Sequence, residues 1–199
     1  MPPIISHKRR ILQALSECRS LFRHCLAPRG LHSDSGIEAA FLQMFRSWES
    51  FLEDSIASFM CSRLRCDQLV VIPLVQCRCE DDAKRFLHMG KGYVEWANVD
   101  ETKERLNALF GDTNLLTTAV SSANADLNHM RTVRNIIAHS SVASRNKFDR
   151  LVQSKYGGHR SLPRAANFLS DSVAIQDAAY TYFDHYSDVL ETVANQITG

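Results

Sequence analysis

Apolar residues recur at three- and four-residue intervals along most of the chain, which is the pattern of helices with one buried face. The longest stripe begins at Phe41 and ends at Phe59, and another, which includes Tyr182 and Val193, lies near the C-terminus. With turn and cap residues as boundaries, the pattern predicts helices over residues 7–27, 35–63, 80–89, 101–110, 113–139, 144–156 and 171–197.

Polar residues mark several of the predicted boundaries. Ser35 and Glu38 have the spacing of a capping box, and Ser144 is placed to cap the helix that follows it. The helix over 113–139 is expected to break near Ser121-Ser122. Residues 66–78 fit either a short extended piece or a loop, and residues 157–167 form a basic loop.

Strand signals are nearly absent, so the pattern predicts an all-α bundle. At 199 residues, the simplest organisation is one domain over 1–199, with an N-terminal helix over about 7–27. The N-terminus lacks the pattern of a secretory signal, and the most apolar run, 69–75, is too short to span a bilayer. We therefore expect a cytoplasmic protein with reduced cysteines and no disulfides.

Charge is unevenly distributed, although the formal net charge is only +1. Residues 131–164 contain eight Lys/Arg and one acid, Asp149, which gives this window +7. The rest of the chain, with 15 basic and 21 acidic residues, carries −6. A strongly basic segment favours a polyanion such as RNA as the partner.

The hexapeptide RNIIAH, residues 134–139, begins this basic segment at the end of a predicted helix. Arg134 and His139 lie about 140° apart around the helix axis, so they do not share one face. Asn135 and His139 do share a face, and Arg131 extends it by one turn. Because one helix cannot easily close Arg134 and His139 around one phosphate, the geometry favours a two-fold dimer whose polar stripes meet in a cleft.

These residue types suit RNA cleavage without a metal, because the 2′-OH beside the scissile phosphate is a built-in nucleophile. His139 can exchange a proton near neutral pH, and Arg134 can hold the non-bridging oxygens while negative charge accumulates. Asn135 would orient either the imidazole or the phosphate. The expected contacts with the RNA backbone are Arg145, Lys147, Arg150, Lys155, Arg160 and Arg164. An Arg and a His at a helix end also suit the helix dipole, which is the structural alternative.

Two segments resemble the HEPN superfamily. RNIIAHSS is similar to its Arg-to-His signature, and AAFLQMFRSWESFLEDSIASFM, residues 39–60, resembles the first core helix of RiboL-PSP-type HEPN domains. The resemblance covers about residues 35–195. It implies a bundle of four to five core helices, here with extra short helices, that dimerises to form one composite cleft.

The resemblance also implies metal-independent endoribonuclease activity, often in toxin–antitoxin or other defence systems, where an antitoxin protein is the further partner. The family's Arg falls on Arg134, its polar neighbour on Asn135 and its His on His139. Some members add an acidic residue from the long helix, for which Glu49 and Glu53 are candidates here. Members without the motif are binding or dimerisation modules.

Other functions remain open on the residues alone. Cys77-x-Cys79 matches none of the usual zinc frameworks, and we interpret Asp184, His185 and Asp188 as a solvated helix face, so we predict no metal and no cofactor. The main alternative to a nuclease is a non-catalytic module that binds nucleic acid or protein. A third possibility is a helical adaptor.

Overall fold

The computed structural model describes residues 3–26, 32–62, 65–66, 69–88, 94–112, 114–139, 141–158, 162–174 and 177–199. Within these ranges the chain is mostly helical, as the apolar periodicity predicts. The helices are α1 (Pro3–Leu26), α2 (Ser33–Cys61), α3 (Glu80–Leu87), α4 (Val99–Phe110), α5 (Leu115–Ser122), α6 (Asn124–Ala138), α7 (Val142–Tyr156), α8 (Ala165–Leu169) and α9 (Tyr182–Thr198). Two antiparallel hairpins pair β1 (Arg65–Cys66) with β2 (Leu69–Val70), and β3 (Ser172–Ala174) with β4 (Asp177–Thr181).

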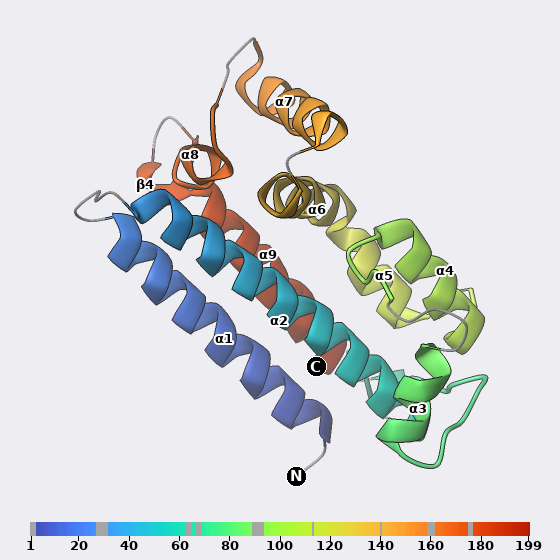
Figure 1. Cartoon of the computed structure of the whole chain (residues 1–199). Helices are drawn as coiled ribbons and strands as arrows, with labels where there is room; N and C mark the ends of the chain where they lie inside the picture. The colour runs from blue at the N-terminus through green and yellow to red at the C-terminus, as the bar shows by residue number, and fades with distance from the viewer. Residues whose placement is uncertain are drawn as a thin grey trace.

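Three long helices form the body of the molecule. The helices α1 and α2 pack as an antiparallel hairpin, and α9 lies along both of them (Figure 1). The aromatic stripe of α2 faces into this packing, since Phe41, Trp48 and Phe59 are fully buried. Burial of each such side chain stabilises the fold by about 1.5–3 kcal/mol or more. The prediction that residues 41–59 form core is thereby confirmed.

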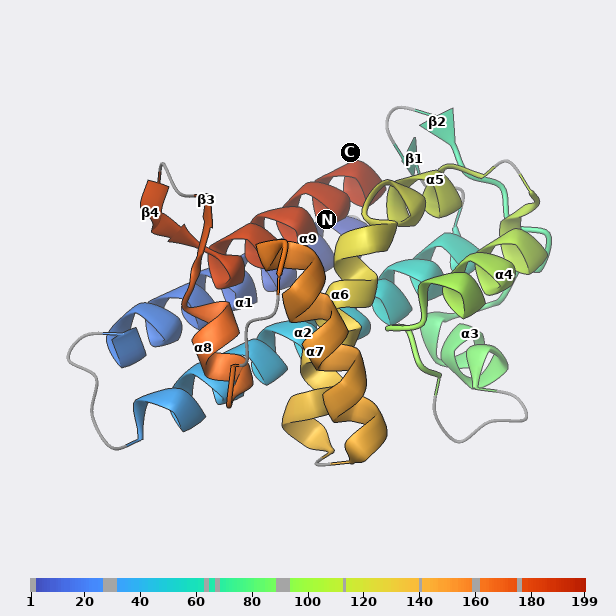
Figure 2. The same ribbon diagram turned by 90° about the horizontal axis from the view of Figure 1, so that it is seen from above.

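The helices α6 and α7 form a second hairpin, which runs across the long helices (Figure 2). Their junction lies at the end of the pair that points away from α9. On the other side of α6, the helices α4 and α5 pack together and α3 contacts the end of α2. This arrangement presents the end of α6 at the periphery of the molecule.

The prediction of one helix over 171–197 is wrong at its beginning. The strands β3 and β4 occupy Ser172–Ala174 and Asp177–Thr181, and α9 begins only at Tyr182. Thr181 and Asp184 form a capping box, in which each side chain accepts a hydrogen bond from the other residue's backbone N–H. The cap fixes the helix start, which the apolar spacing alone does not reveal.

Other helix boundaries also differ from the sequence prediction. Ser35 and Glu38 do not form a capping box, because α2 begins at Ser33 without a side-chain cap. Ser141 rather than Ser144 caps α7, and its Oγ accepts the backbone N–H of Ser144. The predicted break near Ser121-Ser122 is confirmed, since α5 and α6 meet at Ala123. Of the two alternatives for residues 66–78, a short extended piece or a loop, the first holds for the part that forms the β1–β2 pair.

Candidate functional site

The RNIIAH motif lies at the C-terminal end of α6. Arg134 and Asn135 belong to the last helical turns, and the helix ends at Ala138. His139 follows in an extended conformation, with its backbone N–H donating to the Asn135 carbonyl at 2.9 Å. The motif therefore spans a helix end, with the imidazole on the first residue outside the helix.

The side chains of the motif differ in how far they are engaged. Arg134 and Asn135 are half-buried, and Arg134 Nη1 donates a hydrogen bond to Asn135 Oδ1 at 2.9 Å. This contact fixes one edge of the guanidinium group. His139 is exposed, and its ring has no hydrogen-bond partner among the described residues. The imidazole is thus accessible to a substrate or to a second protein chain.

Arg134 and His139 are not brought together within one chain by any hydrogen bond that the described residues make. The helix ends at Ala138 and His139 is extended, so the spacing of helical residues does not fix the direction of the imidazole. Within the described chain, Arg134 contacts Asn135, whereas the exposed imidazole of His139 is not joined to either of them by a hydrogen bond.

Arg131 lies one turn before Asn135 and is engaged with Glu95. Its Nε donates to Glu95 Oε1 at 3.0 Å, and its Nη2 donates to Glu95 Oε2 at 2.9 Å. The two side chains are 31% and 33% exposed. Glu95 was not among the candidates from the sequence, because nothing in its sequence neighbourhood indicates a contact with a residue 36 positions away.

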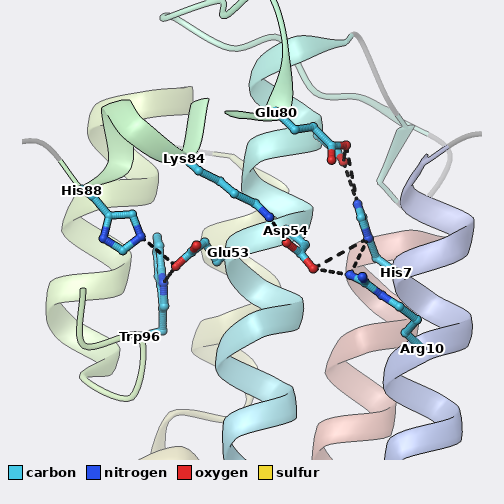
Figure 3. Close-up of polar contacts among 9 residues, drawn as sticks. His7, Arg10, Glu53, Asp54, Glu80, Lys84, His88 and Trp96 are labelled. Carbon is cyan, nitrogen blue, oxygen red and sulfur yellow. Dashed lines mark hydrogen bonds and ion pairs between the residues drawn. The ribbon is translucent and has the colours of Figure 1, made fainter. Parts of the chain in front are cut away.

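The two acidic candidates lie on α2, along a groove of about 1040 Å³ beside α1. The carboxylate of Glu53 accepts the indole N–H of Trp96 at 3.1 Å and contacts His88 Nε2 at 3.2 Å (Figure 3). Glu49 is half-buried and lines the same groove. Glu53 is linked to the motif helix only indirectly, since its partner Trp96 follows Glu95 in the chain.

Two of the predicted RNA contacts bind other parts of the protein. Arg145 donates to the backbone carbonyl of Leu162 at 2.6 Å and contacts Asp149 at 3.1 Å. Arg164 donates to both carboxylate oxygens of Glu38, at 2.6 and 3.3 Å. This pairing raises the pKa of Arg164 above its usual value. Both guanidinium groups therefore help to attach the segment 162–165 to the helices around it.

The remaining basic candidates differ in exposure. Lys147 and Arg150 are exposed on α7 and have no charged partner among the described residues. Lys155 is half-buried, with its Nζ 6.0 Å from the ring centroid of Tyr182. Arg160 lies outside the described residues. Lys147 and Arg150 are thus the basic groups of this segment that are most available to a polyanion.

A second groove, of about 540 Å³, lies directly beside the motif. Its wall contains the half-buried Ile136 and Ile137 of α6 and Val142, which is 78% exposed. Arg145 and Arg164 also line it. Of its apolar residues, Val142 is the one whose side chain is largely exposed, whereas Ile136 and Ile137 pack against the core.

A second polar cluster, which the sequence does not reveal, joins α1, α2 and α3 (Figure 3). Asp54, which is 9% exposed, receives hydrogen bonds from Arg10 and Lys84. This contact raises the pKa of Lys84. The one feature of the sequence that points to this cluster is Asp54, a carboxylate at the start of a run of α2 that is otherwise uncharged as far as Met60.

The buried His7 completes this cluster. Its Nδ1 lies 3.0 Å from Arg10 Nη2, and its Nε2 lies 2.9 Å from Ser58 Oγ. Because a guanidinium can only donate, Nδ1 accepts and the proton resides on Nε2, which donates to Ser58. The Ser58 hydroxyl donates in turn to Glu80. Every nitrogen of this imidazole is engaged, and the serine is 2% exposed, so the arrangement is structural.

The expectation that Asp184, His185 and Asp188 form a solvated face holds for Asp188, which is exposed and pairs with Arg19, but is wrong for Asp184. Asp184 is 5% exposed and accepts from Arg23 at 2.9 Å. His185 Nε2 lies 3.1 Å from Asp126 Oδ1 at the start of α6. These pairs attach α9 to α1 and α6, and their charges balance within the fold.

The cysteines at positions 18, 25, 61, 77 and 79 are free thiols. Burial, followed by the neighbouring Cys77, raises the pKa of Cys61 to about 11. In the described parts of the chain, no three His, Cys, Asp or Glu side chains are grouped so that they could hold a metal ion. No described helix is long and apolar enough to cross a membrane.

Comparison with protein-family models, curated proteins and solved structures finds no significant match to this chain. The residues and geometry described above are therefore the basis for the function.

Proposed function

We propose that this protein is a metal-independent endoribonuclease of HEPN type that acts as a homodimer. The observation that carries the proposal is the motif at the end of α6, where Arg134 is held by Asn135 at 2.9 Å and His139 is exposed. The two groups that the chemistry requires are thus a fixed cation and an accessible imidazole.

The proposed reaction is transesterification by the RNA itself. His139 removes the proton of the 2′-OH, and the 2′-oxygen attacks the adjacent phosphorus. The bond from phosphorus to the 5′-oxygen breaks, and the imidazolium returns the proton to that oxygen. Arg134 stabilises the negative charge on the non-bridging oxygens. The products are a 2′,3′-cyclic phosphate and a 5′-OH.

The dimer is proposed because no described hydrogen bond joins the two groups within one chain. Two α6 ends related by a two-fold axis would bring Arg134 of one copy toward His139 of the other. Val142, three residues after His139, supports such a contact, since it is 78% exposed in the single chain. The resemblance of about residues 35–195 to HEPN domains implies the same composite cleft.

The proposed substrate path follows α7, where Lys147 and Arg150 are exposed. The proposed location is the cytoplasm, the compartment in which reduced cysteines are the default. A role as a toxin or defence effector, with an antitoxin protein as partner, follows from the family resemblance and belongs to the same proposal. Expression of the active protein should then slow growth, and His139→Ala should relieve the effect.

A non-catalytic RNA-binding module is the second candidate. It is favoured by Lys147 and Arg150, whose charges are not balanced by a described neighbour. Such a module binds RNA with a steep dependence on salt but never cuts it. Replacement of Lys147 and Arg150 would then matter more than replacement of His139.

The test is cleavage of RNA in the presence of EDTA by the wild type, by His139→Ala and by His24→Ala. His24 is an exposed histidine on α1 and serves as the matched control. We expect the wild type and His24→Ala to cut equally, with 2′,3′-cyclic phosphate ends, and His139→Ala to be inactive. The proposal fails if the wild type does not cut, if His139→Ala cuts equally well, or if the products carry 5′-phosphates.

A further inference from the structure

The pairing of Arg131 with Glu95 is side-on, which leaves part of the guanidinium group unused. The bonds to Glu95 involve Nε and Nη2. An arginine has five N–H donors, so the two on Nη1 and one on Nη2 remain. Nη1 has no hydrogen-bond partner among the described residues. With 31% of its side chain exposed, Arg131 can present these donors to a ligand without leaving Glu95.

Glu95 lies in a turn that is anchored on both sides. The backbone N–H of Trp96 donates to the Val94 carbonyl at 3.0 Å, and that of Asn98 donates to the Glu95 carbonyl at 3.0 Å. Trp96 is 3% exposed, and its indole N–H donates to Glu53. The carboxylate of Glu95 therefore starts from a fixed backbone position.

The position of Arg131 along α6 determines what it can reach. It precedes His139 by eight residues, or about 12 Å along the helix axis. For a strand stacked as in double-stranded DNA, which advances roughly 3.4 Å per nucleotide, this distance corresponds to about three to four nucleotides. A phosphate bound at Arg131 would thus lie a few nucleotides from the one that is cleaved at His139.

We infer that Glu95 is a positioning residue that holds Arg131 to bind an RNA phosphate a few nucleotides away from the scissile one. This inference rests on the proposed nuclease activity and adds a substrate requirement to it. The enzyme should prefer single strands of several nucleotides over a dinucleotide, because only the longer strand reaches Arg131. A carboxylate so close to a polyanion is useful only because it orients the guanidinium group.

The experiment compares kcat/KM for an RNA of about ten nucleotides with that for a dinucleotide, which has one phosphodiester. The ratio of the two values measures the advantage of length. Arg131→Gln should reduce this ratio about tenfold, the worth of one charge-assisted hydrogen bond. Glu95→Gln should reduce it by about threefold through a higher KM for the longer RNA. The double variant should be no worse than Arg131→Gln, because Glu95 acts through Arg131.

Glu101→Gln is the matched control, since Glu101 pairs with Arg105 at 3.2 Å on α4 with similar exposure, 27% and 24%. It should leave the ratio at the wild-type value. A general loss of folding lowers both activities together and leaves the ratio unchanged, so the ratio separates positioning from stability.

The possible failures are distinguishable. If Glu95→Gln leaves the ratio unchanged or raises it, while the wild type cuts both RNAs, Glu95 is no more than a counter-charge and the inference is overturned alone. If the wild type cuts neither RNA, the proposed function fails and the inference fails with it.

Discussion

The end of α6 and the polar cluster between α1, α2 and α3 each contain an arginine and a histidine close in sequence. In the cluster, His7 is 6% exposed and both of its ring nitrogens are within 3.0 Å of a partner. At the end of α6, His139 is exposed and its ring meets no described hydrogen-bond partner. The same residue types thus serve as a structural tie in one place and remain available for chemistry in the other.

This difference shows that an Arg/His pair in a sequence does not by itself indicate a functional site. The side chains that contact the histidine determine whether the pair is structural or available to a substrate. His7 is surrounded by Arg10, Asp54 and Ser58, so its exchange of a proton with a substrate is blocked. The imidazole of His139 makes no described hydrogen bond within the fold and remains accessible to a substrate.

The largest expected effect is at His139. We predict that His139→Ala reduces the rate of RNA cleavage by about 10²–10⁴-fold, because a general acid–base group is lost. The melting temperature should stay close to that of the wild type, since the imidazole is exposed. Cleavage rates and thermal melting of the same preparations measure both quantities. A large drop in melting temperature would instead assign His139 to the fold.

Asp54 should behave in the opposite way. Asp54→Asn removes the charge that binds Arg10 and Lys84, and we expect it to lower the free energy of unfolding by about 2 kcal/mol. Urea unfolding measures the loss. Cleavage per folded molecule should be retained. The control is Asp82→Asn on α3, where the pair with Arg85 is far more exposed and little should change.

The start of α6 contains a carboxylate whose contribution to stability should depend on pH. His129 and His185 lower the pKa of Asp126 below its usual value of 3.8. A carboxylate with a lowered pKa stabilises the fold above its unfolded pKa, and the contribution is lost as pH falls through the folded value. Asp126→Asn should therefore be less stable than the wild type above about pH 4, with the difference shrinking at lower pH. Urea unfolding across this range measures it, and a constant difference would contradict the assignment.

The smallest expected effect is on α7. The double variant Lys147→Gln/Arg150→Gln should weaken RNA binding several-fold and reduce the slope of log affinity against log salt by about 1–2. Arg46→Gln, an exposed arginine on α2, is the control. RNA binding is measured with variants that also carry His139→Ala, so that cleavage does not disturb the affinity. Unchanged binding would remove α7 from the proposed path.

The sequence predicts the helices well because their cores follow a simple period. Phe41, Trp48 and Phe59 recur at helical spacing and are buried as expected. The start of α9 was missed because a capping box at Thr181 and Asp184 overrides an apolar spacing that continues upstream. Short hairpins such as β3–β4 have too few residues to give a clear period.

The candidate site is predictable only in part. The placement of Arg134, Asn135 and His139 at a helix end follows from local sequence. The partner of Arg131 does not, because Glu95 lies 36 residues away and meets it only through tertiary packing. For the same reason, the sequence does not show that Arg145 binds Leu162 and that Arg164 binds Glu38. In the sequence, all eight basic residues of this segment look equally available.

The most direct test mixes two inactive variants. If Arg134 of one copy acts with His139 of the other, a dimer of Arg134→Ala with His139→Ala contains one intact pair of groups. After subunit exchange, we predict that the mixture regains cleavage, up to about a quarter of the wild-type rate. A mixture that stays as inactive as its separate components, although mixed dimers form, would contradict the composite site.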